Sequence, residues 1–390
     1  MNKDKIDVIY NIGVEFGGVG TGNIAYNAVK WGAYKHNSLK KLLCRTNKSK
    51  DIPKNKVYSF PWLRYVMLPF RALQMWFKWN WICPFPYVDP IYGYLASKNV
   101  NKCDIYHGWC GYSLMGIKRA KKLGAITIVE CASPHPRSKL LSDEFKKYHK
   151  EFQVDEKIIK RNEVELAAAD YILIPSDFVE KSFLEKGYDK NRLIKIPFGV
   201  DLKNFSTTKN KNDNKFRVIF VGSVQLRKGI QYLLKAWDEL KLKNAELLVV
   251  GRIWPDAQEV CKNYFDNPTI KFLGFDSNPK KYYEKSDVFV FPSIEEGSAL
   301  VSYEAMASGL PLIVTPNTGS VMRDGKEGFI IPIRNVNKLK EKIKYMYNHP
   351  EIVKKMGKNA RKLVEQYSWE KYGENLFKEY LRILDERKNK

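Results

Sequence analysis

Two glutamates eight residues apart give the clearest sign of chemistry in this sequence. Glu296 lies in a loop after an apolar strand, and Glu304 lies on a helix predicted to start near Ser298. At about 1.5 Å per residue, the two carboxylates are roughly 12 Å apart along one side of this element. That separation suits the two hydroxyl-rich ends of a nucleotide-sugar. Paired carboxylates also serve glycosidases, but those flank the bond that breaks, whereas these two lie on one element.

The start of the same helix is predicted to bind an anion. The backbone N–H groups of Ser298, Ala299 and Leu300 are expected to be free there. Free amides and the helix dipole attract groups such as a diphosphate. One element is therefore expected to offer a carboxylate for sugar hydroxyls, amides for phosphate and a carboxylate for ribose hydroxyls.

Two cations are expected to face the same ligand. Arg227 and Lys228 follow the strand that ends at Gly222 and Ser223. Residues after a strand of a parallel sheet project at its carboxyl end, where the ligands of such sheets bind. Lysine as a point charge and arginine as a fork both suit phosphate.

The elements that position these residues alternate between short apolar strands and amphipathic helices, which is typical of parallel α/β architecture. A polar linker at Lys203–Lys215 separates two halves. We expect two Rossmann-like, doubly wound domains facing a central cleft. The predicted units are an acceptor-side domain, a donor-binding domain and a terminal helix that packs back on the first domain: 1–205, 206–370 and 371–390.

The second half resembles the donor domain of the retaining glycosyltransferases of family GT4, the glycosyl transferases group 1, which have the GT-B fold. The resemblance rests on VGS-xxx-RKGIQYLLKAW, LLVVGR, IKFLGF, SDVFVFPS, EEGSALVSYEAMASGLP and a glycine-rich stretch at Gly319–Phe329. The first half matches more weakly, through a glycine-rich turn at Gly17 and Gly18, DIYH, ADYILIPSDF and IPFGVD.

The resemblance implies roles for individual residues. Glu296 is implied to meet the transferred sugar, Glu304 the ribose and Lys228 the diphosphate. Gly17 and Gly18 are implied to lie near the donor phosphate and the acceptor, with a histidine beside the sugar. The predicted site is completed by residues from matched segments: His107, Ser223, Arg227, Gly251 and Leu273.

The resemblance also implies the reaction. It implies transfer of a sugar with retention of anomeric configuration, without a metal or other cofactor, the cations stabilising the leaving nucleoside diphosphate. No carboxylate nucleophile is evident, which favours front-face attack with the leaving phosphate accepting the proton. The expected acceptor is a surface glycan or a lipid-linked intermediate, and a small soluble acceptor is the alternative.

The sequence departs from the family pattern at one phosphate-binding position. Ser223 stands where the family usually has arginine, and Arg227 is a possible substitute. EGSAL replaces the commoner EGFGL in the glutamate motif. These departures keep open a catalytically silent protein that binds a nucleotide-sugar or a polyanion. The loop Ser133–Arg137 is either an acceptor loop or a structural proline turn.

Composition limits where the protein works and what it binds. The chain has 390 residues and a formal charge of +24, from 67 basic and 43 acidic side chains. The excess indicates a polyanion, an anionic membrane surface or simply a solvated surface. Nucleic acid is not expected, since no helix-turn-helix, zinc finger or RNP-type motif is present. The six cysteines form no CxxC pair or zinc pattern, so we expect a reducing, cytoplasmic setting.

One segment suggests a membrane surface. Phe60–Phe85 has no acidic residue, three basic residues and four tryptophans. Tryptophan and basic side chains around an apolar face suit the headgroup region of a bilayer, which predicts peripheral association with the inner face of the cell membrane. The alternative is a buried helix pair interrupted by Pro69.

Overall fold

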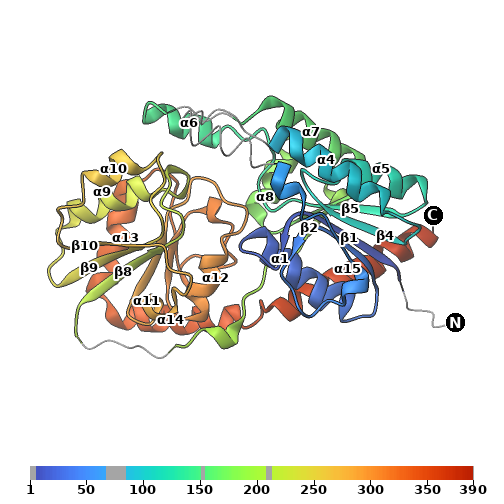
Figure 1. Ribbon diagram of the computed structural model, residues 1–390. Helices are drawn as coiled ribbons and strands as arrows, with labels where there is room; N and C mark the ends of the chain where they lie inside the picture. The colour runs from blue at the N-terminus through green and yellow to red at the C-terminus, as the bar shows by residue number, and fades with distance from the viewer. Residues whose placement is uncertain (1–5, 67–84, 151–153, 208–212, 390) are drawn as a thin grey trace.

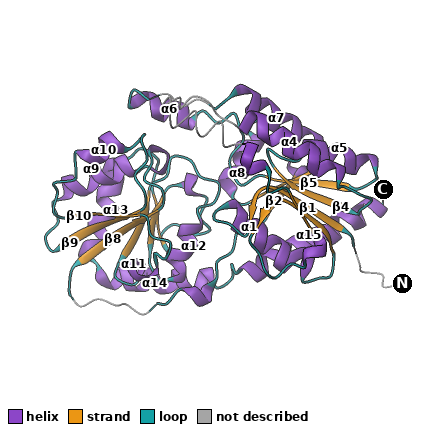
Figure 2. Ribbon diagram, viewed as in Figure 1, coloured by secondary structure: helices purple, strands orange, loops and turns teal. Residues whose placement is uncertain are grey.

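The computed structural model describes residues 6–66, 85–150, 154–207 and 213–389. Within them the chain forms two parallel β-sheets, each with helices on both faces (Figures 1 and 2). The two doubly wound domains expected from the sequence are therefore confirmed.

The N-terminal sheet has seven strands in the order β3-β2-β1-β4-β5-β6-β7. β1 pairs with β2 on one side and with β4 on the other, so the strand order reverses there and opens a crevice at the carboxyl ends. The strands are β1 (Val8–Phe16), β2 (Leu39–Asn47), β3 (Val57–Ser59), β4 (Ile105–Trp109), β5 (Ile126–Glu130), β6 (Tyr171–Ile174) and β7 (Leu193–Lys195).

The C-terminal sheet has six strands in the order β10-β9-β8-β11-β12-β13. Its order reverses between β8 and β11, which places a second crevice next to the segments that follow these two strands. The strands are β8 (Phe216–Val221), β9 (Ala245–Val250), β10 (Ile270–Gly274), β11 (Val288–Phe291), β12 (Leu312–Val314) and β13 (Gly328–Ile330).

Helices cover both sheets. Those that follow the N-terminal strands are α1 (Thr21–Asn27), the π-helix η1 (Ala28–Tyr34), α2 (Leu63–Val66), α4 (Phe85–Lys98), α5 (Leu114–Lys122), α6 (Leu140–Lys147), α7 (Glu156–Ala168) and α8 (Asp177–Leu184). The C-terminal half contributes α9 (Ile230–Leu240), α10 (Gln258–Lys262), α11 (Lys280–Tyr283), α12 (Leu300–Ala307), α13 (Val336–Asn348), α14 (Pro350–Val364) and α15 (Trp369–Lys388). Short 3₁₀ turns are η2 (Lys54–Lys56), η3 (Lys190–Arg192), η4 (Leu202–Asn204), η5 (Leu226–Lys228) and η6 (Pro316–Thr318).

Because helices cover both faces of the C-terminal sheet, its strands are nearly continuous apolar runs, as in the FRVIFV of β8.

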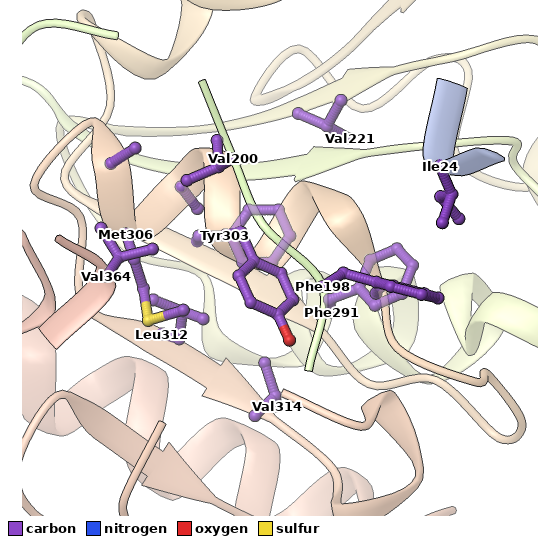
Figure 3. Close-up of a cluster of buried hydrophobic side chains, with 14 of the residues drawn as sticks. Ile24, Phe198, Val200, Val221, Phe291, Tyr303, Met306, Leu312, Val314 and Val364 are labelled. Carbon is purple, nitrogen blue, oxygen red and sulfur yellow. The ribbon is translucent and has the colours of Figure 1, made fainter. Parts of the chain in front are cut away.

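The segment that joins the two domains is part of the buried core. Phe198 and Val200, which follow β7, belong to the same buried cluster as Tyr303 of α12 (Figure 3). The segment leaving the first domain is therefore anchored against the second.

The last helix, α15, returns to the N-terminal domain (Figure 1). It packs on η1 so closely that a Cβ on Gly373 would lie 2.4 Å from Trp31. The rings of His36 and Phe377 stack with centroids 3.9 Å apart. The N-terminal sheet thus has one face covered by a helix from the far end of the chain.

The sequence analysis did not identify β2, β3 and β7. β3 and β7 have three residues each and are mostly not buried, so no apolar run marks them, and Lys40 and Lys41 interrupt the apolar run of β2. In the Trp-rich segment, Trp62 is 48% exposed, while residues 67–84 lie outside the described residues. No helix in the described ranges has both the length and the apolar character needed to cross a membrane.

Candidate functional site

The loop that carries the two predicted cations is fixed against the end of β11. Arg227 and Lys228 lie in η5, and Gly229 follows with a left-handed φ of 73°. A Cβ on Gly229 would lie 1.9 Å from the carbonyl oxygen of Pro292, so only glycine allows this approach. The N–H of Ile294 donates to the carbonyl of Arg227 at 2.9 Å, which ties η5 to the loop that carries the glutamates.

Both cations contact one carboxylate. Lys228 Nζ and Arg227 Nη1 both pair with Oε1 of Glu296, the arginine at 2.5 Å. Arg227 Nη1 also donates to the carbonyl of Glu295 at 3.0 Å. No residue in the described ranges donates to Glu296 Oε2, which leaves that oxygen able to accept a ligand hydroxyl.

Lys228 has a lowered pKa. Its side chain is 11% exposed, and burial lowers the pKa of Lys228 to about 8, although Glu296 acts to raise it and Arg227 adds to the lowering. The ammonium form therefore predominates at pH 7, at a site where little water competes with an anion.

Glu304 is positioned separately, in the middle of α12. Its Oε2 accepts a hydrogen bond from the hydroxyl of Tyr283 at 3.1 Å, and burial raises the pKa of its carboxyl group. Tyr283 is fully buried in α11 and fixes this rotamer. The structure therefore gives Glu304 its own support, apart from the cluster of Arg227, Lys228 and Glu296.

The predicted set of free amides needs correction. α12 starts at Leu300 and not at Ser298, and the N–H of Ala299 donates to the carbonyl of Thr318 at 3.0 Å. The Ser298 hydroxyl is buried and donates to the carbonyl of Gly319 at 3.0 Å. Ala299 therefore has no amide to offer a diphosphate, because the loop after β12 already uses it.

The remaining donor-side residues lie at strand ends. Ser223 follows β8 and Leu273 lies in β10, partly exposed at 38%. A Cβ on Gly251 would lie 1.8 Å from the carbonyl oxygen of Gly222, so the glycine lets the ends of β8 and β9 approach closely. Ser223 and Gly251 follow the neighbouring strands β8 and β9, while Leu273 lies on β10 at the edge of the sheet.

The glycine-rich turn of the first domain faces the second domain. Gly17 and Gly18 lie between β1 and α1, and Figure 1 shows α1 on the side toward α12. Thr21, the first residue of α1, lines a cavity of about 390 Å³ together with Glu295. The turn is thus near the loop that carries the glutamates.

His107 is not in the cleft, which corrects the prediction. His107 lies in the middle of β4, which continues to Trp109, and its imidazole is fully buried in the sheet. Its Nδ1 shares a hydrogen bond of 2.6 Å with the Tyr380 hydroxyl, and its Nε2 lies 3.2 Å from Glu130. The contact with Tyr380 joins α15 to the first sheet, and the ring of His107 is not exposed to the cleft.

Sequence reasoning missed residues through which the two domains meet. The Ser176 hydroxyl donates to the carbonyl of Gly297 at 2.5 Å, and a Cβ on Gly297 would lie 1.4 Å from the carbonyl oxygen of Ala132. The hydroxyl of Ser138 bonds to Glu295 Oε2. Such contacts span more than a hundred residues and leave no local pattern in the sequence.

Of the loop Ser133–Arg137, the residues Ser133 to Pro136 line the cavity of about 390 Å³ beside this junction. Its His135 is buried, and Nδ1 accepts from the N–H of Arg137 at 3.3 Å, so the neutral ring carries its proton on Nε2. Trp109, Tyr112 and Asn162 line the same cavity, and Asn162 Oδ1 is buried with no hydrogen-bond partner in the described part of the chain.

The profile of the family described as Glycosyl transferases group 1 matches residues 203–363. These residues are a glycosyl transferases group 1 domain. The match contains η5, the glutamate loop and α12, so the cluster around Glu296 lies inside the group 1 domain. The match begins after the last strand of the first sheet, and it was in that first half that the sequence resemblance was weaker.

Relatives of the group 1 domain include the capsular polysaccharide biosynthesis glycosyltransferase CapM of Staphylococcus aureus. It is 28% identical over 239 residues, which cover 55% of this chain and 63% of CapM. The matched part thus spans less than two thirds of that relative's length.

Solved structures resemble nearly the whole chain. Sucrose-phosphate synthase of Thermosynechococcus elongatus gives a TM-score of 0.71 at 20% identity, covering 97% of this chain and 99% of that one. HepE of Anabaena, in complex with UDP and glucose, gives 0.66 at 14% identity, covering 98% and 100%. The chain therefore has the GT-B fold, with the group 1 domain as its second half.

Proposed function

We propose that the protein is a retaining glycosyltransferase that moves a sugar from a nucleotide-sugar donor to a glycan or lipid-linked acceptor. The observation that carries the proposal is the cluster of Lys228, Arg227 and Glu296 at the crevice of a group 1 domain. It combines cations for a diphosphate with a carboxylate for sugar hydroxyls.

The proposed roles follow from these contacts. Lys228 and Arg227 stabilise the negative charge that grows on the leaving nucleoside diphosphate, and Glu296 Oε2 accepts from the transferred sugar. Glu304, held by Tyr283, accepts from the ribose. The exposed aromatic rings of Trp254 and Phe275 follow β9 and β10 and offer stacking surfaces for the nucleobase.

The acceptor is proposed to occupy the cavity of about 390 Å³, which residues of the first domain line together with Glu295 of the second. Trp109 and Tyr112 supply flat surfaces for a sugar ring, and the unpartnered Oδ1 of Asn162 accepts from a hydroxyl. The acceptor oxygen bonds to the anomeric carbon on the face that the diphosphate leaves. The bond from that carbon to the phosphate oxygen breaks, and the acceptor proton passes to the leaving phosphate.

Activity is tested by incubating the protein with UDP-, GDP- and ADP-sugars and measuring release of the nucleoside diphosphate. Lys228→Ala should lower turnover about 10²-fold, because leaving-group stabilisation is lost. Lys235→Ala is the matched control, since that side chain lies on the surface of α9 and is 59% exposed. Anomeric proton couplings of the product, measured by NMR, test retention; inversion would contradict it.

A catalytically silent sugar-nucleotide-binding protein is the second candidate. It is favoured by Ser223, which places no cation at the end of β8, and by the involvement of both nearby cations with Glu296. Binding of one donor without turnover of any, measured in the same panel, would favour it over the enzyme.

Presentation of the acceptor at the inner membrane face remains a proposal from the sequence of Phe60–Phe85. Flotation of the protein with anionic liposomes tests it, comparing the wild type with a variant in which Trp76, Trp79 and Trp81 are alanine. Equal recovery of the two proteins would contradict membrane association through this segment.

A further inference from the structure

One segment of the first domain lies on the second. Residues 138–150, here named the strap, are part of the connection between β5 and α7 and contain α6. Figure 1 shows α6 on the side of the C-terminal domain, apart from the other helices of its own half. α6 contacts η5, the turn that carries Arg227 and Lys228.

The strap is held through a buried carboxylate. Glu144 in α6 is fully buried, and its Oε1 accepts from Gln231 Nε2 at 2.8 Å and from the Tyr232 hydroxyl at 2.7 Å. Its Oε2 accepts from Arg334 Nε at 2.5 Å. All three donors belong to the second domain. The side-chain hydrogen bonds to the Glu144 carboxylate therefore all come from the domain opposite its own.

Gln231 connects this carboxylate to the cationic turn. Its Nε2 donates both to Glu144 and, at 2.9 Å, to the carbonyl of Leu226, the first residue of η5. Its Oε1 is buried with no partner in the described ranges. The two acceptors together therefore set the orientation of the amide, and Glu144 is one side chain away from the backbone of η5.

The other end of the strap holds the glutamate loop. Ser138 bonds to Glu295 Oε2, and the carbonyl of Glu295 accepts from Arg227. Arg334 also donates to the carbonyl of Leu140 at 2.9 Å, and its backbone has a left-handed φ of 61°. A non-glycine residue keeps such a conformation only where its surroundings fix it.

We infer that Glu144 is a positioning residue for the donor site: the strap of the first domain, acting through Gln231, holds the turn that binds the diphosphate. The inference rests on the proposed function. Removing the carboxylate frees the Gln231 amide to reorient and loosens the Leu226 carbonyl. Arg227 and Lys228 then lose their fixed position, while the surface for the nucleoside stays unchanged.

The test compares two ligands by calorimetry: a nucleoside diphosphate, taken as the one of UDP, GDP and ADP that the wild type binds most tightly, and its nucleoside. Glu144→Gln and Gln231→Met should each weaken diphosphate binding about 5- to 10-fold, the value of one lost hydrogen bond to a charged or positioned group. Nucleoside affinity should stay within twofold of the wild type.

Tyr232→Phe is the matched control. It removes a hydrogen bond to the same oxygen of Glu144, but the donor to the Leu226 carbonyl is Gln231 and stays in place, so diphosphate binding should stay within twofold. If the strap only joined the domains, all three variants would lower the melting temperature and none would separate diphosphate from nucleoside. Circular dichroism shows whether Gln231→Met is folded. If this folded variant binds the diphosphate as tightly as the wild type, the inference is overturned, even where Glu144→Gln does not fold. Absence of diphosphate binding by the wild type would instead refute the proposed function.

Discussion

Raising the pH should weaken binding of a nucleoside diphosphate, because Lys228 then loses its proton. Burial lowers the pKa of this lysine to about 8, with Glu296 opposing and Arg227 adding to the shift. Only the ammonium form attracts the diphosphate, so affinity is full below this pKa and falls above it. At pH 9 about nine tenths of the free protein carries neutral lysine, which raises the apparent Kd about eightfold relative to pH 7.5.

Calorimetry between pH 7.5 and pH 9 measures this effect. The diphosphate raises the pKa of the bound lysine, so binding at pH 9 should take up about one proton, seen as a dependence of the heat on the buffer's ionisation enthalpy. Lys228→Arg is the matched control, since a guanidinium stays charged over this range and its Kd should not change. A wild-type Kd that is flat to pH 9, or an arginine variant with the same slope, would refute the reasoning.

Three further outcomes are expected. Gly297→Ala should reduce turnover about 10²-fold, because its Cβ would lie 1.4 Å from the Ala132 carbonyl and force the domains apart, which small-angle scattering would detect as a larger radius; wild-type turnover would contradict this contact. Glu304→Ala should weaken nucleotide binding about tenfold, measured by calorimetry, with the fold intact by circular dichroism; unchanged affinity would remove the ribose role. Treatment with EDTA should leave turnover unchanged, and restoration of a lost activity by Mg²⁺ would show a metal requirement.

The sequence predicted the architecture where the pattern was strong. The strands of the second domain are apolar runs between polar turns. The positions of Lys228 and Glu296 after two of these strands predicted that both face one ligand, and in the structure the two side chains form an ion pair. It failed where one residue decides the geometry. His107 was expected beside the sugar, but it lies in the middle of β4 and its side chain is buried inside the sheet.

Long-range contacts were beyond the reach of sequence patterns. Glu144 lies on a short amphipathic helix and is indistinguishable there from a solvated carboxylate, yet its three partners lie 87 to 190 residues away. The Ala299 amide was predicted to be free because it was expected at the start of a helix, whereas it donates to the carbonyl of Thr318 in a different loop. Both outcomes depend on how separate segments meet, which a periodicity or a motif does not encode.

The return of α15 has a consequence for dividing the protein. Tyr372 donates to Glu130 at 2.9 Å and Tyr380 bonds to His107, so the final helix satisfies polar groups at the centre of the first sheet. A fragment that stops at the linker would lose these partners and uncover an apolar face. An exchange of donor halves between relatives therefore has to keep α15 with the amino-terminal half, because the first domain is built from two separate segments of the chain.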